Sequence, residues 1–328
     1  MKLSRVGVDL AKNVFQVHGV DRFGEVVWRR RLTRKRWLPA LMEQADPGCE
    51  IGMEACASAH HWARELQSHG YTVRLIPPQF VKPYVKSNKN DANDAEAICE
   101  AMSRPHMRFV SVKSVEQQDI QAIHRVREEL KAHRNAKANQ IRGLVAEYGL
   151  VAPKTLLALR RAIPEWLEDA ENGLTDLFRE ELFGLYEELR HLDERIAHYD
   201  EKIKQIARAD ERMHRLQTIP GVGPATCAVL IAEIGDIDRF DDVDQLLAYA
   251  GVHPAERSSG RKGSDPETSW HMSKAGNAHL RAAAYRLAVV GLTHNPVIKA
   301  HYARKRQAGK SKMNALGHCM SKALNLVW

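Results

Sequence analysis

The sequence has few cysteines, no long apolar run and, in its C-terminal part, few acidic residues. Its five cysteines, at positions 49, 56, 99, 227 and 319, include no Cys-x-x-Cys pair. This pattern argues against a disulfide framework or a zinc site and fits a reducing compartment. Neither a signal peptide nor an apolar run of membrane-spanning length is present. We therefore expect a soluble, cytoplasmic protein without a membrane partner.

The charge is unevenly distributed along the 328 residues. The chain has 49 Lys or Arg against 41 Asp or Glu, which gives a formal net charge of +8. Residues 246–328 hold 13 Lys or Arg and only 3 Asp or Glu, so the excess lies in the C-terminal part. A basic surface favours polyanionic partners such as nucleic acids. The length predicts two or three domains.

The N-terminal third alternates short apolar runs with turn signals and helical stretches. Three consecutive strand-like runs joined by short turns predict an antiparallel meander. Helices and further strands alternate after it, an order typical of the ribonuclease H-like fold. The predicted strands lie in 6–12, 14–20, 25–32, 49–54, 72–76 and 107–112, and the predicted helices are 33–44 and 58–69.

Four acidic residues lie on these elements. Asp9 lies on the first strand and Glu54 ends the fourth, while Asp91 and Asp94 open a helical stretch and share one of its faces. Carboxylates placed together repel one another, so they favour a bound Mg²⁺ or Mn²⁺, which suits phosphoryl transfer. Each acid alone also has a structural explanation, as a strand end or as a partner of a helix N-terminus. The four together predict a metal-dependent phosphodiester chemistry.

A helix predicted from about residue 114 to 148 has a basic stripe beside its apolar one. Arg127, Lys131, Arg134 and Lys137 recur at spacings of four and three. The stripe is either a solvated helix surface or a contact with a nucleic-acid backbone.

A second long helix carries nine apolar residues, from Phe178 to Ile206, spaced alternately by four and three. Four heptads of this kind predict a coiled coil. An intramolecular hairpin with the preceding helix and a contact between subunits both satisfy the pattern.

The C-terminal part contains three further candidate contacts with nucleic acid. Gly221 and Gly223 precede a helix predicted over 225–234, as in a helix-hairpin-helix motif that holds a phosphate; a structural turn is the alternative. A small, polar loop places serines beside Arg257, Arg261 and Lys262, which would stabilise charge on a phosphoryl group; a solvated Ser-Gly turn is the alternative. Lys274 and Arg281, on a helix predicted to begin near Ser273, suit phosphate contacts or a solvated face.

These motifs, in this order, resemble the DEDD-type transposases of the insertion-sequence one-ten family, which include pilin-gene invertases and are described as bridge recombinases. The resemblance covers essentially the whole chain. It rests on Gly7-Val8-Asp9-Leu10-Ala11-Lys12, Met53-Glu54-Ala55, Asp91-Ala92-Asn93-Asp94-Ala95, Ile219-Pro220-Gly221-Val222-Gly223-Pro224, Ala250-Gly251-Val252, Ser258-Ser259-Gly260 and Ser273-Lys274-Ala275-Gly276-Asn277.

The resemblance implies a domain plan and a mechanism. A RuvC-like domain (1–112) would hold the metal-binding tetrad, a helical coiled-coil arm would span 113–211, and a mainly helical transposase domain would span 212–328. Ser259, or as second choice Ser258, would attack DNA to form a phosphoserine intermediate. The family also implies a homodimer or homotetramer, donor and target DNA as substrates, and a structured noncoding guide RNA that selects the sites by base pairing.

Two other functions remain compatible with the residues. A RuvC-like endonuclease or Holliday-junction resolvase would hydrolyse DNA with the same acids and would need no serine. A coiled-coil nucleic-acid scaffold would need neither the acids nor the serine.

Overall fold

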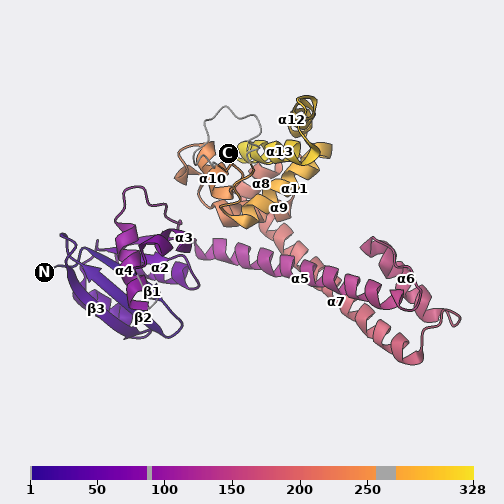
Figure 1. Ribbon diagram of the computed structural model, residues 1–328, viewed down its shortest axis with the longest axis horizontal. Helices are drawn as coiled ribbons and strands as arrows, with labels where there is room; N and C mark the ends of the chain where they lie inside the picture. The colour runs from indigo at the N-terminus through magenta and orange to yellow at the C-terminus, as the bar shows by residue number, and fades with distance from the viewer. Residues whose placement is uncertain (1, 87–90, 256–270) are drawn as a thin grey trace. The chain divides into compact units, whose positions relative to one another are not determined.

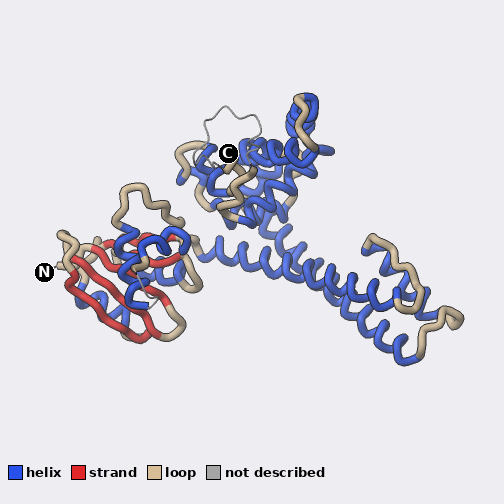
Figure 2. The backbone as a smooth tube through the Cα atoms, in the orientation of Figure 1, coloured by secondary structure: helices blue, strands red, loops and turns tan. Residues whose placement is uncertain are grey.

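The computed structural model describes residues 2–86, 91–255 and 271–328 and divides into two compact units, Met1–Ser114 and Val115–Trp328. The first unit contains all the strands of these described ranges, and the second is helical (Figures 1 and 2). In the described ranges, no helix has the length and apolarity needed to cross a membrane.

The first unit is built on a five-stranded sheet in the order β3-β2-β1-β4-β5. Strands β1 (Arg5–Leu10), β2 (Val14–Val20) and β3 (Val26–Thr33) form an antiparallel meander, and β4 (Glu50–Glu54) and β5 (Thr72–Ile76) run parallel to β1. This mixed α/β arrangement confirms the predicted strand order and is consistent with a RuvC-like domain.

The two faces of the sheet are covered by different helices. Val6 and Val8 of β1 belong to a core with α1 (Trp37–Gln44) and α2 (Ala59–Ser68). Phe15, Trp37 and Trp62 meet edge to face at the centre of this core, with ring centroids 5.2–5.5 Å apart. Helix α4 (Asp91–Met102) lies on the opposite face, where it packs on β1 and β2.

The prediction of a strand over residues 107–112, all of which the structure describes, is wrong. Only Val110 pairs, through an isolated bridge to Leu75 of β5. The link between β5 and α4 includes the short helix α3 (Pro78–Val81) and a 3-10 turn, η1 (Lys82–Tyr84). Residues 107–112 carry apolar side chains, but a single bridge at the sheet edge provides too few hydrogen bonds for a strand.

The second unit begins with a long helical hairpin. Helix α5 (Val115–Ala146) packs along α7 (Asp176–Ala209), and α6 (Leu156–Glu168) covers their far end (Figure 1). The buried residues of α7 include Leu182, Leu189, Ile196 and Ile203, which recur every seven positions. Part of the predicted heptad stripe is therefore buried inside the chain, as the hairpin alternative requires.

The remaining helices form a bundle around the end of this hairpin. They share one core, in which residues of α9 are buried along almost its whole length. The elements are α8 (Glu211–Gln217), α9 (Pro224–Ile234), η2 (Ile237–Arg239), α10 (Val243–Ala250), α11 (Ala278–His294), α12 (Pro296–Gln307) and α13 (Lys312–Val327). Helix α11 begins five residues later than predicted, because the side chain of Asn277 caps it by accepting hydrogen bonds from the N–H groups of His279 and Leu280.

Candidate acidic metal site

Two glycines allow α4 to lie directly on the sheet. A Cβ atom on Gly7 would be 2.2 Å from the carbonyl oxygen of Ala95 and 2.6 Å from the amide nitrogen of Cys99. A Cβ on Gly52 would be 2.7 Å from the sulfur of Met102. The register pairs Gly7 with Gly52 on the adjacent parallel strands. These two positions form a seat for α4: main-chain atoms leave no room for a side chain at Gly7, and the side chain of Met102 fills the space beside Gly52.

The seat explains why the acids share one face. Side chains alternate along a strand, so Asp9 lies on the same face as Gly7, and Glu54 on the same face as Gly52. Asp91 and Asp94 are in the first turn of α4, the helix that covers this face. The pattern Gly-x-Asp on β1 and Gly-x-Glu on β4 thus places a helix seat and a carboxylate two residues apart on each of two neighbouring strands.

The structure brings three of the four predicted acids into one group. Carboxylate oxygens of Asp9, Asp91 and Asp94 all lie within 4.8 Å of one another; Asp9 and Asp94 are half-buried and Asp91 is exposed. Glu54 is not in this group and ends the neighbouring strand. The donors are all hard oxygens, which Mg²⁺ and Mn²⁺ prefer, and a divalent cation would offset the repulsion among the carboxylates. The donor set therefore fits the expected metal.

Cys56 lies close to both strand acids. Burial raises the pKa of its thiol, and the charges of Glu54 and Asp9 raise it further. The thiol therefore stays protonated at neutral pH and is a poor nucleophile.

Glu96, one turn after Asp91, ties α4 to the meander. Its carboxylate accepts hydrogen bonds from Arg29 of β3 at 2.8 Å and from Lys86 at 2.9 Å. The hydrogen bond from Lys86 lowers the pKa of Glu96 although burial opposes the change. Sequence reasoning missed Glu96, because Arg29 lies 67 residues away along the chain.

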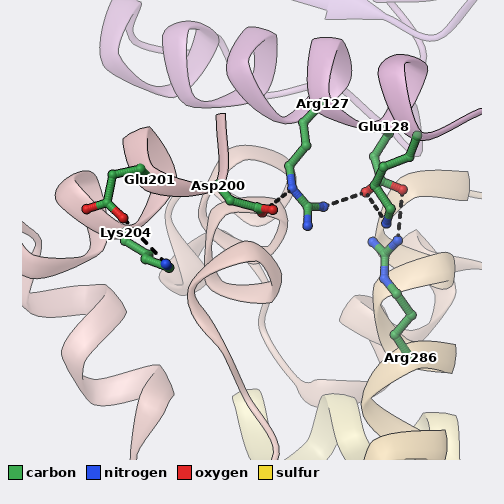
Figure 3. A network of polar contacts seen from close by, with 7 residues as sticks. Arg127, Glu128, Asp200, Glu201, Lys204 and Arg286 are labelled. Atoms are coloured by element: carbon green, nitrogen blue, oxygen red, sulfur yellow. Dashed lines mark hydrogen bonds and ion pairs between the residues drawn. The ribbon is translucent and has the colours of Figure 1, made fainter. Parts of the chain in front are cut away.

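The basic stripe of α5 is occupied by carboxylates of its own unit. Figure 3 shows Arg127 donating to Asp200 of α7 at 2.6 Å and to Glu128 at 2.9 Å, while Glu128 also accepts from Arg286 of α11 at 3.1 Å. Lys131 pairs with Glu128, Arg134 with Asp193, and Lys137 with Glu188. The four side chains are between 14% and 31% exposed, so this face of α5 is a layer of ion pairs within the unit.

The predicted serines and the cations beside them lie outside the described residues: Ser258, Ser259, Arg257, Arg261 and Lys262. The chain on either side of residues 256–270 is paired. Pro254 and Met272 form an antiparallel bridge, and the N–H of Ala255 donates to the carbonyl of His271 at 2.7 Å. The two ends of this segment are therefore held side by side.

A buried carboxylate fixes the segment after this bridge. Glu233, 6% exposed, accepts hydrogen bonds from Asn277 Nδ2 and from Gln121 Nε2, each at 2.8 Å. A Cβ on Gly276 would be 2.5 Å from the carbonyl oxygen of Tyr249, so this segment also lies backbone to backbone against the end of α10. Sequence reasoning did not single out Glu233.

The remaining predicted contacts lie at turns, except that Arg281 lies in the first turn of α11. Gly221 adopts a positive φ of 94° and Gly223 caps the N-terminus of α9, so a tight turn joins α8 to α9 as predicted. Lys274 has a positive φ of 56° and precedes α11 rather than lying on it. Arg281 donates to the carbonyl of Ala250 at 3.1 Å.

Two family comparisons match most of the chain. A DEDD-type IS110 family described as "Transposase" matches residues 6–149, and "Transposase IS116/IS110/IS902 family" matches residues 213–303. Among curated proteins, a "Probable family 20 transposase" of Pseudomonas aeruginosa is 46% identical over 86% of this chain and 82% of its own length. The transposase for insertion sequence element IS1111A of Coxiella burnetii is 44% identical over 84% of this chain and 74% of its own.

A more distant relative is named for the inversion of a gene. The pilin gene-inverting protein of Moraxella bovis is 26% identical over 81% of this chain and 73% of its own length. The resemblance drawn from the motifs is confirmed by these matches. The chain belongs to the IS110/IS116/IS902 family and is a bacterial DNA transposase.

Proposed function

We propose that this transposase cuts and rejoins DNA through a phosphoserine intermediate, at a divalent metal site formed by Asp9, Asp91, Asp94 and Glu54. The observation that carries this proposal is the group of three carboxylates whose oxygens lie within 4.8 Å of one another. Glu54 ends the strand beside that of Asp9 and would complete the site from there.

Mg²⁺ or Mn²⁺ held by these residues would stabilise charge on the phosphoryl, attacking and leaving oxygens. The other residues of the chain position these ligands. The seat at Gly7 and Gly52 and the ion pairs of Glu96 hold the first turn of α4 against the strand that carries Asp9. The ligands then need little rearrangement when they bind the cation.

The nucleophile in this proposal is Ser259, with Ser258 as the second choice. Its hydroxyl oxygen forms a bond to phosphorus and loses its proton, while the bond from phosphorus to the 3′ oxygen breaks and that oxygen gains a proton. One phosphoester replaces another, so the bond energy is conserved and a 3′ hydroxyl can later reverse the step on a new strand. No external energy source is required.

A guide RNA and self-association complete the proposal. A structured noncoding RNA would choose donor and target DNA by base pairing, and a homodimer or homotetramer would bring the serine of one subunit to the acids of another. Residues of α7 outside its buried face, such as Phe183, which is 55% exposed, are available for a coiled-coil contact between arms.

A denaturing gel that detects a covalent protein–DNA adduct tests the proposal. The assay combines the full chain, the RNA encoded beside its gene, matched DNA and Mg²⁺, with Ser259→Ala, Ser258→Ala and Asp9→Asn in parallel. We expect an adduct that Ser259→Ala and Asp9→Asn abolish and Ser258→Ala retains. If only Ser258→Ala abolished the adduct, the nucleophile would be Ser258. Cleavage without an adduct in any lane would show the hydrolytic mechanism instead. A reaction without the RNA tests whether adduct formation depends on it.

A further inference from the structure

The C-terminal part of the chain carries cations that have no acidic counterpart in the local sequence. Residues 268–328 contain ten Lys or Arg and neither Asp nor Glu. Seven of the ten lie on or between α12 and α13, which pack against each other. They are Lys299, Arg304, Lys305, Arg306, Lys310, Lys312 and Lys322. We call α12, α13 and these cations the cationic hairpin.

The cationic hairpin differs from the basic stripe of α5 in what its charges meet. Among the described residues, residues 271–328 take part in one ion pair, between Arg286 and Glu128, which does not include the hairpin. Arg304 instead contacts the ring of His301 at 2.9 Å, and Arg306 donates to the carbonyl of Lys310. These partners are neutral groups, so the positive charge of the hairpin is not offset within the described chain.

Helix stability explains only part of this arrangement. Arg304, Lys305 and Arg306 are in the last turn of α12, where cations are favourable beside the helix dipole. Lys310 and Lys312, however, flank the N-terminus of α13, where cations are unfavourable, and no acid occupies its first turn. An external anion would offset this cost.

The two histidines within the hairpin report the same positive potential. Burial lowers the pKa of His301, and Arg304 and Lys305 lower it further. Burial likewise lowers the pKa of His318, with further lowering from Lys305 and Lys310. Lys322 of α13 also lowers the pKa of His301, so cations of both helices and of the turn between them act on one small region.

The cations of α12 flank a narrow face of small residues. Ile298 is buried against the end of α11, which fixes the inner side of the helix. At 100° per residue, the opposite side carries the small residues Ala300 and Ala303 and, at its end, the longer Gln307, all of them exposed. Lys299 and Arg306 border this face on one side and Arg304 borders it on the other. Figure 1 shows α12 at the outer margin of the bundle.

We propose that the cationic hairpin binds duplex DNA, with the small-residue face of α12 in the major groove and its flanking cations on the phosphates of both strands. The major groove of B-DNA is about 12 Å wide and admits one helix, whereas the major groove of A-form RNA is too narrow. Twelve residues of helix span about 18 Å, a length along which duplex DNA carries roughly ten phosphates. This inference deepens the proposed function, because it names the surface that holds the DNA.

Equilibrium binding of the full chain to a labelled DNA duplex in EDTA tests this surface without cleavage. The variant Lys299→Gln/Arg304→Gln/Arg306→Gln removes three exposed cations that flank the small face. The matched control, Lys202→Gln/Lys204→Gln/Arg208→Gln, removes three exposed cations from α7. Both triple variants change the net charge equally, and glutamine preserves helix propensity. A duplex RNA probe is measured in parallel.

We expect the α12 variant to lose DNA affinity by about 8-fold per phosphate contact at roughly 0.1 M salt, with the slope of log affinity against log salt reduced by about 0.9 per contact. The α7 control variant should retain the wild-type DNA affinity and the wild-type salt dependence. Wild-type protein should protect guanine N7, in the major groove, from methylation. Equal losses in both variants, no loss in either, or a loss on RNA as large as on DNA would overturn the proposal. Because EDTA suppresses cleavage, these outcomes are independent of the phosphoserine step.

Discussion

Acidification is expected to destabilise the helical unit through one buried histidine of α5. His124 is 7% exposed, and neither of its ring nitrogens has a hydrogen-bond partner among the described residues. Burial lowers its pKa from 6.5 to about 4; Arg286, Arg127 and His279 add to this effect, and Glu128 opposes it. The folded state therefore binds the proton less readily than the unfolded state does.

The sign and size of the effect follow from this difference. Between pH 6.5 and 4 the unfolded chain holds the proton and the folded chain does not, so stability falls as the pH falls. A pKa difference of about 2.5 corresponds to about 3 kcal/mol when fully developed, and to about 2 kcal/mol between pH 7.5 and 5.

Urea unfolding at pH 7.5 and pH 5 measures this loss. His124→Leu removes the titrating group from the core and should reduce the loss by about 2 kcal/mol. The control is His133→Gln, which removes an exposed histidine from the same helix. An unaltered pH dependence in His124→Leu would refute the reasoning.

Three further predictions concern the acidic site and the segment before α11. Gly7→Ala should lift α4, cost about 1–3 kcal/mol in thermal unfolding and weaken Mn²⁺ binding; Gly143→Ala, on an open helix surface, should instead stabilise by up to about 1 kcal/mol. Asp94→Asn should weaken Mn²⁺ binding in titration calorimetry by about tenfold or more, and unchanged affinity would exclude it as a ligand. Glu233→Gln should cost about 1–3 kcal/mol and speed hydrogen exchange around residue 277, because an amide cannot accept from both Gln121 and Asn277 on separate oxygens.

The sequence was most informative where spacing alone determines geometry. The three-residue spacing of Asp91 and Asp94 predicted that these two carboxylates share one face of a helix, and in the structure the carboxylate of Asp9 lies beside them. The seat beneath α4 was not foreseen, because a glycine in a strand carries no pattern that reveals which helix covers it. The need for glycine at position 7 becomes evident only from the contact with α4.

The ion pairs between α5 and α7 also could not be predicted from the sequence. Arg127 and Arg134 form a basic stripe when α5 is considered alone, but Asp200 and Asp193 approach from α7, 73 and 59 residues further along the chain. Periodicity within one helix identifies a face and says nothing of what the chain later folds onto it. The packing of α5 against α7, and not the spacing within α5, determines which groups those charges contact.

The contact between α4 and the sheet also affects which substitutions the fold can tolerate. Because α4 rests on main-chain atoms at Gly7, its distance from β1 does not depend on the volume of any side chain at that contact. The aromatic core lies on the other face of the sheet, around Phe15, Trp37 and Trp62. Conservative exchanges in that core therefore leave the main-chain contact between Gly7 and α4 unaltered.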